Sequence, residues 1–105
     1  MSVMKSYFKK IRSLKIPVNR QGFLHYMCLG YANLPKELKE LIDNTINDAC
    51  RCEEDRKMMK EYLFTEKSLI KVAIDSFASE RKIYRLRAKI FSQLYKKIYI
   101  DGIFQ

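Results

Sequence analysis

The sequence SERKIYRLRAKI, residues 79–90, places basic side chains on a segment that also keeps a regular apolar stripe. Residues three and four apart share one face of a helix. That spacing continues past the stretch and gives an apolar face of Ile83, Leu86, Ile90, Leu94 and Ile98. At about 100° per residue, the opposite face carries Arg81, Arg85, Lys89, Ser92 and Lys96, with Tyr84 and Ala88 beside them. The pattern predicts a helix over 79–98 that packs with one face and can meet phosphate with the other.

The start of this helix is marked in the sequence. Ser79 is a favourable N-cap residue because its hydroxyl can accept a hydrogen bond from a first-turn amide, and Glu80 complements the helix dipole. Seven basic and no acidic side chains lie between Arg81 and Lys97, which favours a polyanionic partner. A solvated basic face with no partner is the alternative interpretation.

Residues 65–75 predict a shorter helix just upstream, capped by Thr65, with Leu69, Ile70 and Ala73 apolar. A small residue at 73 lets two helices cross closely, and the following turn of about three or four residues suits a helix-turn-helix. Phe77 stands where glycine is frequent in such turns, and Ala78 where a branched apolar residue usually fills the core. We therefore expect Ile74 or Phe77 to fill the core instead.

Residues 56–64, the shorter helix, and Ser79-Glu80-Arg81 with the basic helix together resemble a known family. They are similar to the C-terminal region of RinA/ArpU-type phage late transcription regulators, which in turn looks like region four of bacterial sigma factors. The resemblance covers roughly residues 48–100, about half of the chain, and helix-turn-helix motifs are short and degenerate. It implies a promoter-binding activator of late viral genes that contacts RNA polymerase in a Gram-positive host.

Composition and length predict a small all-α protein of 105 residues with little room for an enzyme. The net charge of +9 is uneven: residues 1–32 carry +6, residues 33–64 carry −2 and residues 65–105 carry +5. We divide the chain into an N-terminal helical segment, 1–47, for packing, dimerisation or partner binding, and a helix-turn-helix DNA-binding region, 48–105.

The N-terminal segment predicts a helical hairpin. Residues 1–15 place Met4, Tyr7, Phe8, Ile11 and Leu14 on one stripe among basic side chains. Such a helix can bind an anionic membrane surface, but packing within the protein or across a dimer is favoured. Pro17 ends this helix, and residues 21–31 form a second apolar stretch that we expect to be buried on most sides.

The middle of the chain predicts two more helices. The first begins at Asn33 or Leu34, with Pro35 in its first turn, and breaks near residues 47–51. Asp48 is the expected cap of the second helix, whose first turn holds three acidic residues. That helix would pack against the helix-turn-helix as the third member of a trihelical unit through Met58, Met59, Tyr62 and Leu63.

Cysteine and histidine suggest one chemical site, because His25, Cys28, Cys50 and Cys52 offer four potential zinc ligands. The signal is weak, since a Cys-x-Cys pair on a helix points its sulfurs about 200° apart. We expect no metal and no cofactor, and the His25–Cys28 pair lacks an orienting carboxylate for catalysis. No apolar run approaches the roughly 20 residues that cross a bilayer. We expect the cytoplasm of a bacterial host.

The sequence predicts a sequence-specific activator that binds double-stranded DNA. We expect the N-terminal part of the helix, from Ser79, to lie at the major groove, with Arg81, Arg85 and Tyr84 reaching base edges. Phosphate contacts would come from Lys71, Lys82, Lys89 and Lys96. The alternative is an interaction protein that binds RNA polymerase or another regulator through a sigma-like domain. Further expected partners are a second copy of the chain and a small protein inhibitor or co-regulator.

Overall fold

Residues 16–102 are described by the computed structural model, and within this range the chain is helical, without strands. The helices are α2 (Val18–Leu29), α3 (Lys36–Ala49), α4 (Glu53–Phe64), α5 (Leu69–Ser76) and α6 (Glu80–Tyr95). A 3₁₀ segment, Tyr31–Asn33, precedes α3, and a π-helical turn, Lys96–Ile100, continues α6. The predicted small all-α fold is confirmed. The first arm of the predicted hairpin, residues 1–15, lies outside the described residues.

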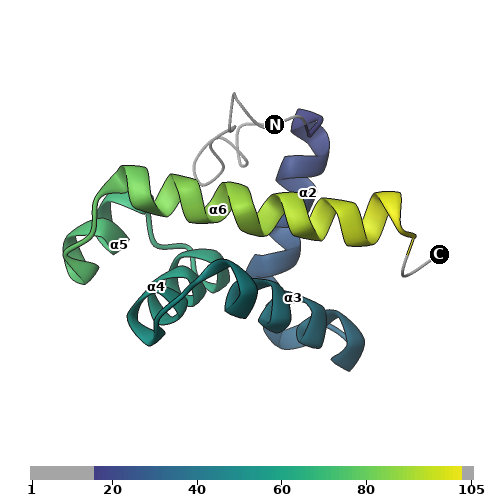
Figure 1. The fold of residues 1–105 in the computed structure, drawn as a ribbon, viewed down its shortest axis with the longest axis horizontal. Coiled ribbons are helices and arrows are strands. Elements are labelled where there is room, and N and C mark those ends of the chain that lie inside the picture. Colours follow the sequence, from purple (N-terminus) through teal and green to yellow (C-terminus); the bar gives the residue numbers. More distant parts are fainter. Residues whose placement is uncertain (1–15, 103–105) are drawn as a thin grey trace.

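Helix α6 runs across the molecule and contacts each of the other four helices (Figure 1). Its inner side carries the predicted stripe: Ile83, Leu86, Ile90 and Leu94 are buried, and Ile98 is partly buried against the same core. Since the stripe fixes which side of α6 faces inward, it also fixes which residues face solvent.

Helix α4 contributes the predicted core residues Met58, Met59, Tyr62 and Leu63, all of them buried. The Tyr62 hydroxyl accepts a hydrogen bond of 2.8 Å from the guanidinium of Arg87, which is also fully buried. The same guanidinium lies 5.2 Å from the centroid of the Tyr84 ring. Arg87 therefore holds α6 to α4, and it is not part of the exposed charge of α6 although its sequence neighbours are.

Two prolines stand at the N-cap positions of α2 and α3, Pro17 and Pro35. Helix α3 therefore begins at Lys36, slightly later than predicted. Helix α2 buries Leu24, Met27 and Cys28 but leaves Phe23 and Tyr26 exposed. Gln21, Gly22 and His25 are buried as well, so residues 21–31 are buried on most sides, as expected, and within them only Phe23 and Tyr26 are exposed.

Helix α3 ends at Ala49, and α4 begins after residues 50–52, so the predicted break is present. Asp48 is not the cap of α4: it lies in the last turn of α3, and Cys52 occupies the N-cap position without a side-chain cap bond. The acidic first turn of α4 is as predicted, with Glu53, Glu54 and Asp55.

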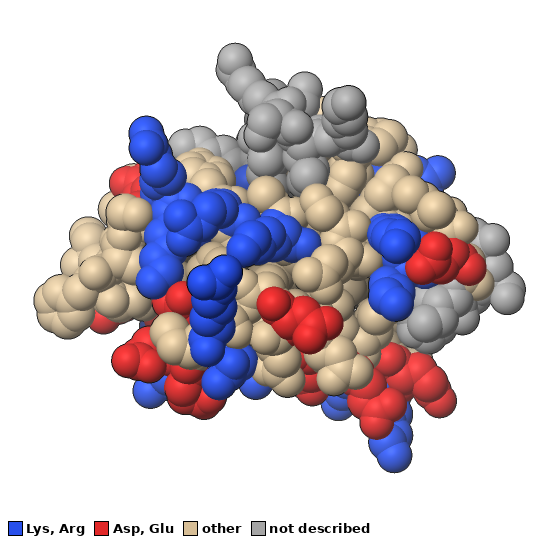
Figure 2. Space-filling view, in the orientation of Figure 1, with Lys and Arg blue, Asp and Glu red and all other residues tan. Residues whose placement is uncertain are grey.

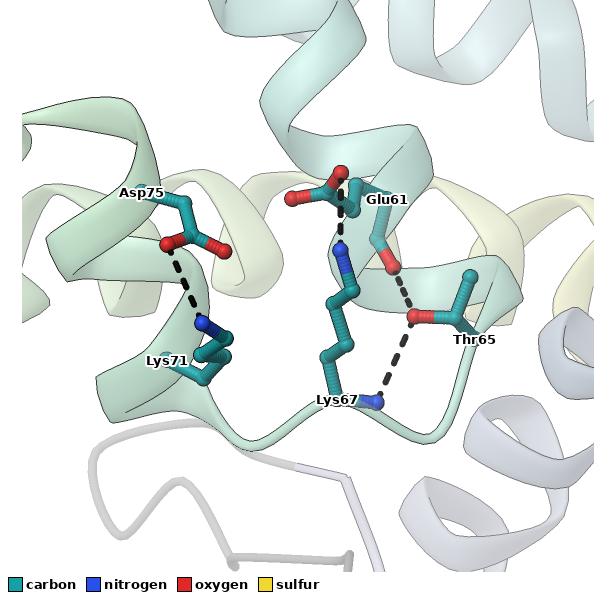
Figure 3. A network of polar contacts seen from close by, with 5 residues as sticks. All are labelled: Glu61, Thr65, Lys67, Lys71 and Asp75. Atoms are coloured by element: carbon teal, nitrogen blue, oxygen red, sulfur yellow. Dashed lines mark hydrogen bonds and ion pairs between the residues drawn. The ribbon is translucent and has the colours of Figure 1, made fainter.

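Thr65 is not the cap of α5 but follows the last residue of α4, where its hydroxyl donates a hydrogen bond to the Glu61 carbonyl. Helix α4 reaches Phe64, so the cap of α5 moves to Ser68, whose hydroxyl accepts a hydrogen bond of 3.1 Å from the Lys71 amide. Figure 3 shows Thr65 between Glu61 and Lys67, with the Lys67–Glu61 ion pair of 3.3 Å beside it.

A turn of three residues, 77–79, joins α5 to α6, in agreement with the predicted length. Phe77 has the left-handed conformation (φ 54°), and the Ala78 amide donates a hydrogen bond of 3.0 Å to the Ala73 carbonyl. Ile74 and Phe77 do not fill the core. Ile74 is 66% exposed and Phe77 is 98% exposed, so the expectation that one of them fills the core is wrong. Val72 and Ala73 supply the buried side of α5 instead.

Replacing Phe77 by glycine should stabilise the protein. A left-handed residue with a Cβ atom costs roughly 1–2 kcal/mol, part of which is offset by the greater freedom of glycine in the unfolded chain. Almost no buried surface is lost. We expect the free energy of unfolding in urea to rise by roughly 0.5–1 kcal/mol for Phe77→Gly. Phe77→Ala keeps the strained Cβ and should show no such gain; equal stability of the two variants would contradict the strain.

His25 lies buried on α2, and desolvation, aided by the positive charge of Arg87, lowers the pKa of its imidazole from 6.5 to about 4. The folded state therefore holds neutral histidine at a pH where the unfolded chain binds a proton. The stability that the protein has while His25 is neutral in both states is fully present above pH 6.5, and it is lost as the pH falls toward 4.

The free energy of unfolding should consequently fall between pH 6.5 and pH 5, before most carboxylates titrate. Urea unfolding across this range measures the slope. The variant His25→Gln removes the titrating group and should flatten the slope. An unchanged slope in His25→Gln would assign the pH dependence to other groups.

Candidate nucleic-acid interface

The N-terminus of α6 is fixed by the predicted cap. The Ser79 hydroxyl accepts a hydrogen bond of 3.0 Å from the Lys82 amide, and Glu80 lies in the first turn. Such a cap satisfies one of the amides that a helix start leaves unpaired. The first turns of α6 are therefore held in a defined orientation.

The outer side of α6 and the following turn is mostly basic, as the periodicity predicted: Arg81, Arg85, Lys89 and Lys96 are exposed, and so is Ser92 on the same side. Figure 2 shows most of the blue surface gathered over the half of α6 nearest α5, with a smaller blue region toward its other end. Arg81, Arg85 and Lys89 succeed one another at four-residue intervals within residues 80–89 of α6.

Arg51 joins these residues from the loop between α3 and α4. It lines a shallow hollow of about 280 Å³ together with Arg85 and Lys89. We call Arg51, Arg81, Arg85 and Lys89 the basic face. Sequence reasoning missed Arg51 because it is separated from α6 by about thirty residues and belongs to no periodic pattern. Asp48 and Gln93 line the adjoining hollow along α6.

Lys82 points to the side of α6 that meets α4, where its ammonium lies 2.8 Å from the Asp55 carboxylate. The hydrogen bond that Lys82 donates to the Asp55 carboxylate raises the pKa of the lysine. Asp55 is largely shielded from solvent and Lys82 is partly so. The charge of Lys82 is thus partly compensated within the protein.

The remaining predicted site residues lie apart from one another. Lys71 is on α5 and forms an ion pair of 3.4 Å with Asp75 (Figure 3). Tyr84 is half-buried beside the Arg87 guanidinium. Lys96 begins the π-helical turn, well beyond the basic face.

The four potential zinc ligands do not converge. Within residues 16–102, no group of three or more histidine, cysteine or acidic side chains is arranged to hold a metal ion. Cys28 and Cys50 are buried free thiols, and Cys52 is exposed. Burial raises the pKa of Cys28 to about 12, so its thiol is protonated at neutral pH. In the described part of the chain, no helix is both long enough and apolar enough to cross a membrane.

Comparison with known proteins relates this helical chain to a class of phage regulators. It is 32% identical over 74 residues to the transcriptional activator rinA of Staphylococcus phage phi11. The match covers 70% of this chain and 51% of that protein, so the chain spans about half the length of its relative. No family model and no solved structure matches.

This similarity confirms the resemblance to RinA-type phage regulators. The matched stretch of 74 residues is longer than residues 48–100, which carry the resemblance in the sequence.

Removing the cap of α6 should destabilise the protein by about 1 kcal/mol, because Ser79→Ala leaves a first-turn amide without its partner. Urea unfolding measures the loss. Ser92→Ala is the matched control, since Ser92 is exposed in the middle of the same helix. It should change stability by no more than about 0.5 kcal/mol. Equal effects of the two substitutions would argue against the cap.

Proposed function

We propose that the chain is a sequence-specific DNA-binding transcriptional regulator that activates phage late genes. The observation that carries the proposal is the basic face, in which three residues of one rigid helix and one residue of a neighbouring loop present positive charge together. The similarity to a phage transcriptional activator supports the same class of function.

Helices α4, α5 and α6 have the dimensions of a helix-turn-helix unit. Helix α5 has eight residues, α6 has sixteen, and the turn between them is three residues long. The three helices pack against one another through the buried residues of each. In this proposal α6 is the recognition helix and enters the major groove with its N-terminal half.

The chemistry of the basic face suggests different roles for arginine and lysine. Arg81 and Arg85 carry planar guanidinium groups that can pair with the acceptor atoms of guanine. Lys89 and Arg51 flank Arg85, where they would bind phosphates and set the register. Because these contacts displace counterions, the affinity would fall steeply with salt.

The other predicted contacts take secondary places in the proposal. Lys82 would reach phosphate only by sharing its charge with Asp55. Lys71 and Lys96 would contact the phosphate backbone of the DNA at the borders of the site. The half-buried Tyr84 would contact the DNA through the exposed edge of its ring.

The test begins with selection of bound duplexes from a random pool, followed by anisotropy titration of the winner and of scrambled DNA at two salt concentrations. Arg85→Ala should cost about 1–3 kcal/mol on the selected duplex and relax specificity at one position. Arg51→Ala should weaken all duplexes alike and reduce the salt slope by about 1.

Lys60→Ala is the control, because it removes one exposed positive charge from α4 outside the basic face. It should bind DNA nearly as the unchanged protein does. Equal losses on selected and scrambled DNA for Arg85→Ala would remove the base-reading role. Weak, unenriched and salt-insensitive binding would favour the alternative, a regulator that binds RNA polymerase or another protein.

A further inference from the structure

Helix α5 exposes an apolar face that no described residue covers. Ile70, Ile74 and Phe77 recur at the spacing of one helix side and are 58%, 66% and 98% exposed. The stripe is about 10 Å long at 1.5 Å per residue. Helix α5 stands at one end of the molecule (Figure 1), and the same end is largely tan in Figure 2, next to the blue surface. We call these three residues the α5 face.

Phe77 shows that this exposure is maintained at a cost. A phenylalanine with positive φ is strained, and such strain persists where a function requires the side chain. Glycine would relieve the strain but would also remove the ring from the face. The residue therefore fits a contact surface better than a solvated turn.

The charge around the α5 face permits the approach of a second copy. Residues 61–79 carry two lysines and three acidic residues, a net charge of −1, in a chain whose net charge is +9. Both lysines are paired, Lys67 with Glu61 and Lys71 with Asp75 (Figure 3). Two copies that meet here avoid the repulsion that their basic faces would cause.

The size of the face limits how strong such a contact is. Three side chains per copy fall well short of the roughly 800 Å² per partner of a stable complex. The pair would be weak in free solution and would need a tether that raises the effective concentration. A shared DNA duplex supplies that tether.

We propose that the α5 face pairs with the α5 face of a second copy bound at a neighbouring site on the same duplex. In an antiparallel pair related by a two-fold axis near Ile74, Ile70 of each copy meets Phe77 of the other. The DNA part of this inference rests on the proposed function, whereas the pairing itself does not.

The pairing is tested without DNA by amide NMR spectra of the full chain at about 50 µM and about 1 mM, a range that reveals millimolar association. We expect concentration-dependent shifts at residues 69–77. These shifts should vanish in the double variant Ile70→Ser/Ile74→Ser. They should persist in the control Ile100→Ser, because Ile100 is as exposed as Ile74, at 66%, but lies outside the α5 face. Unchanged spectra, shifts confined to another surface, or shifts that survive the double substitution would overturn the proposal.

The second arm uses duplexes that carry one or two copies of the selected site at several spacings. At the best spacing, the second copy should bind roughly tenfold more tightly than to a single site. The double variant should lose this gain and keep the single-site affinity. Cooperativity that survives in the double variant would overturn the inference. Failure to bind single sites would refute the proposed function, while the spectra would still decide the pairing.

Discussion

The burial of one side of α6 is the constraint on which the rest of the structure depends. Helices α2, α3, α4 and α5 all pack against α6, so the rotation of α6 about its own axis sets both the core and the exposed surface of the described residues. Arg87 makes that rotation specific. A buried guanidinium is costly unless it is paired, and here it donates to Tyr62 of α4. A rotation of α6 about its own axis would expose the apolar stripe and would at the same time break the hydrogen bond between Arg87 and Tyr62.

Local patterns were sufficient to predict most of α6. The apolar stripe depends only on a period of 3.6 residues, and the Ser79 cap only on its immediate neighbours. The prediction of the N-cap residue was wrong where two suitable residues lie close together in the sequence. Thr65 and Ser68 are both suitable N-caps, and the choice between them depends on α4 extending to Phe64, which is decided by packing. Asp48 was likewise a wrong prediction for the N-cap of α4, because helix α3 continues through Asp48.

Residues separated along the chain account for what the sequence did not predict in the candidate site. Arg87 and Arg85 are both arginines on one helix, but only Arg87 turns toward Tyr62, 25 residues away. Arg51 approaches Arg85 from a loop whose position follows from how α3 and α4 pack. The sequence predicts Ile74 or Phe77 in the core, because apolar side chains are usually buried. Val72 and Ala73 lie on the opposite side and occupy the core instead.

Charge is distributed unevenly over the exposed surface. Asp55 and Asp75 pair with Lys82 and Lys71, and residues 53–79 carry six acidic and five basic side chains, so the side of the molecule formed by α4 and α5 has no excess of positive charge. Arg51, Arg81, Arg85 and Lys89 form no ion pair among those found in the described residues. Unpaired basic side chains gather over the outer side of α6 (Figure 2), and such a surface suits a polyanionic partner. In the proposed DNA complex, the nearly neutral end of α5 would stay exposed beside the duplex, where a protein contact would cost little electrostatic repulsion.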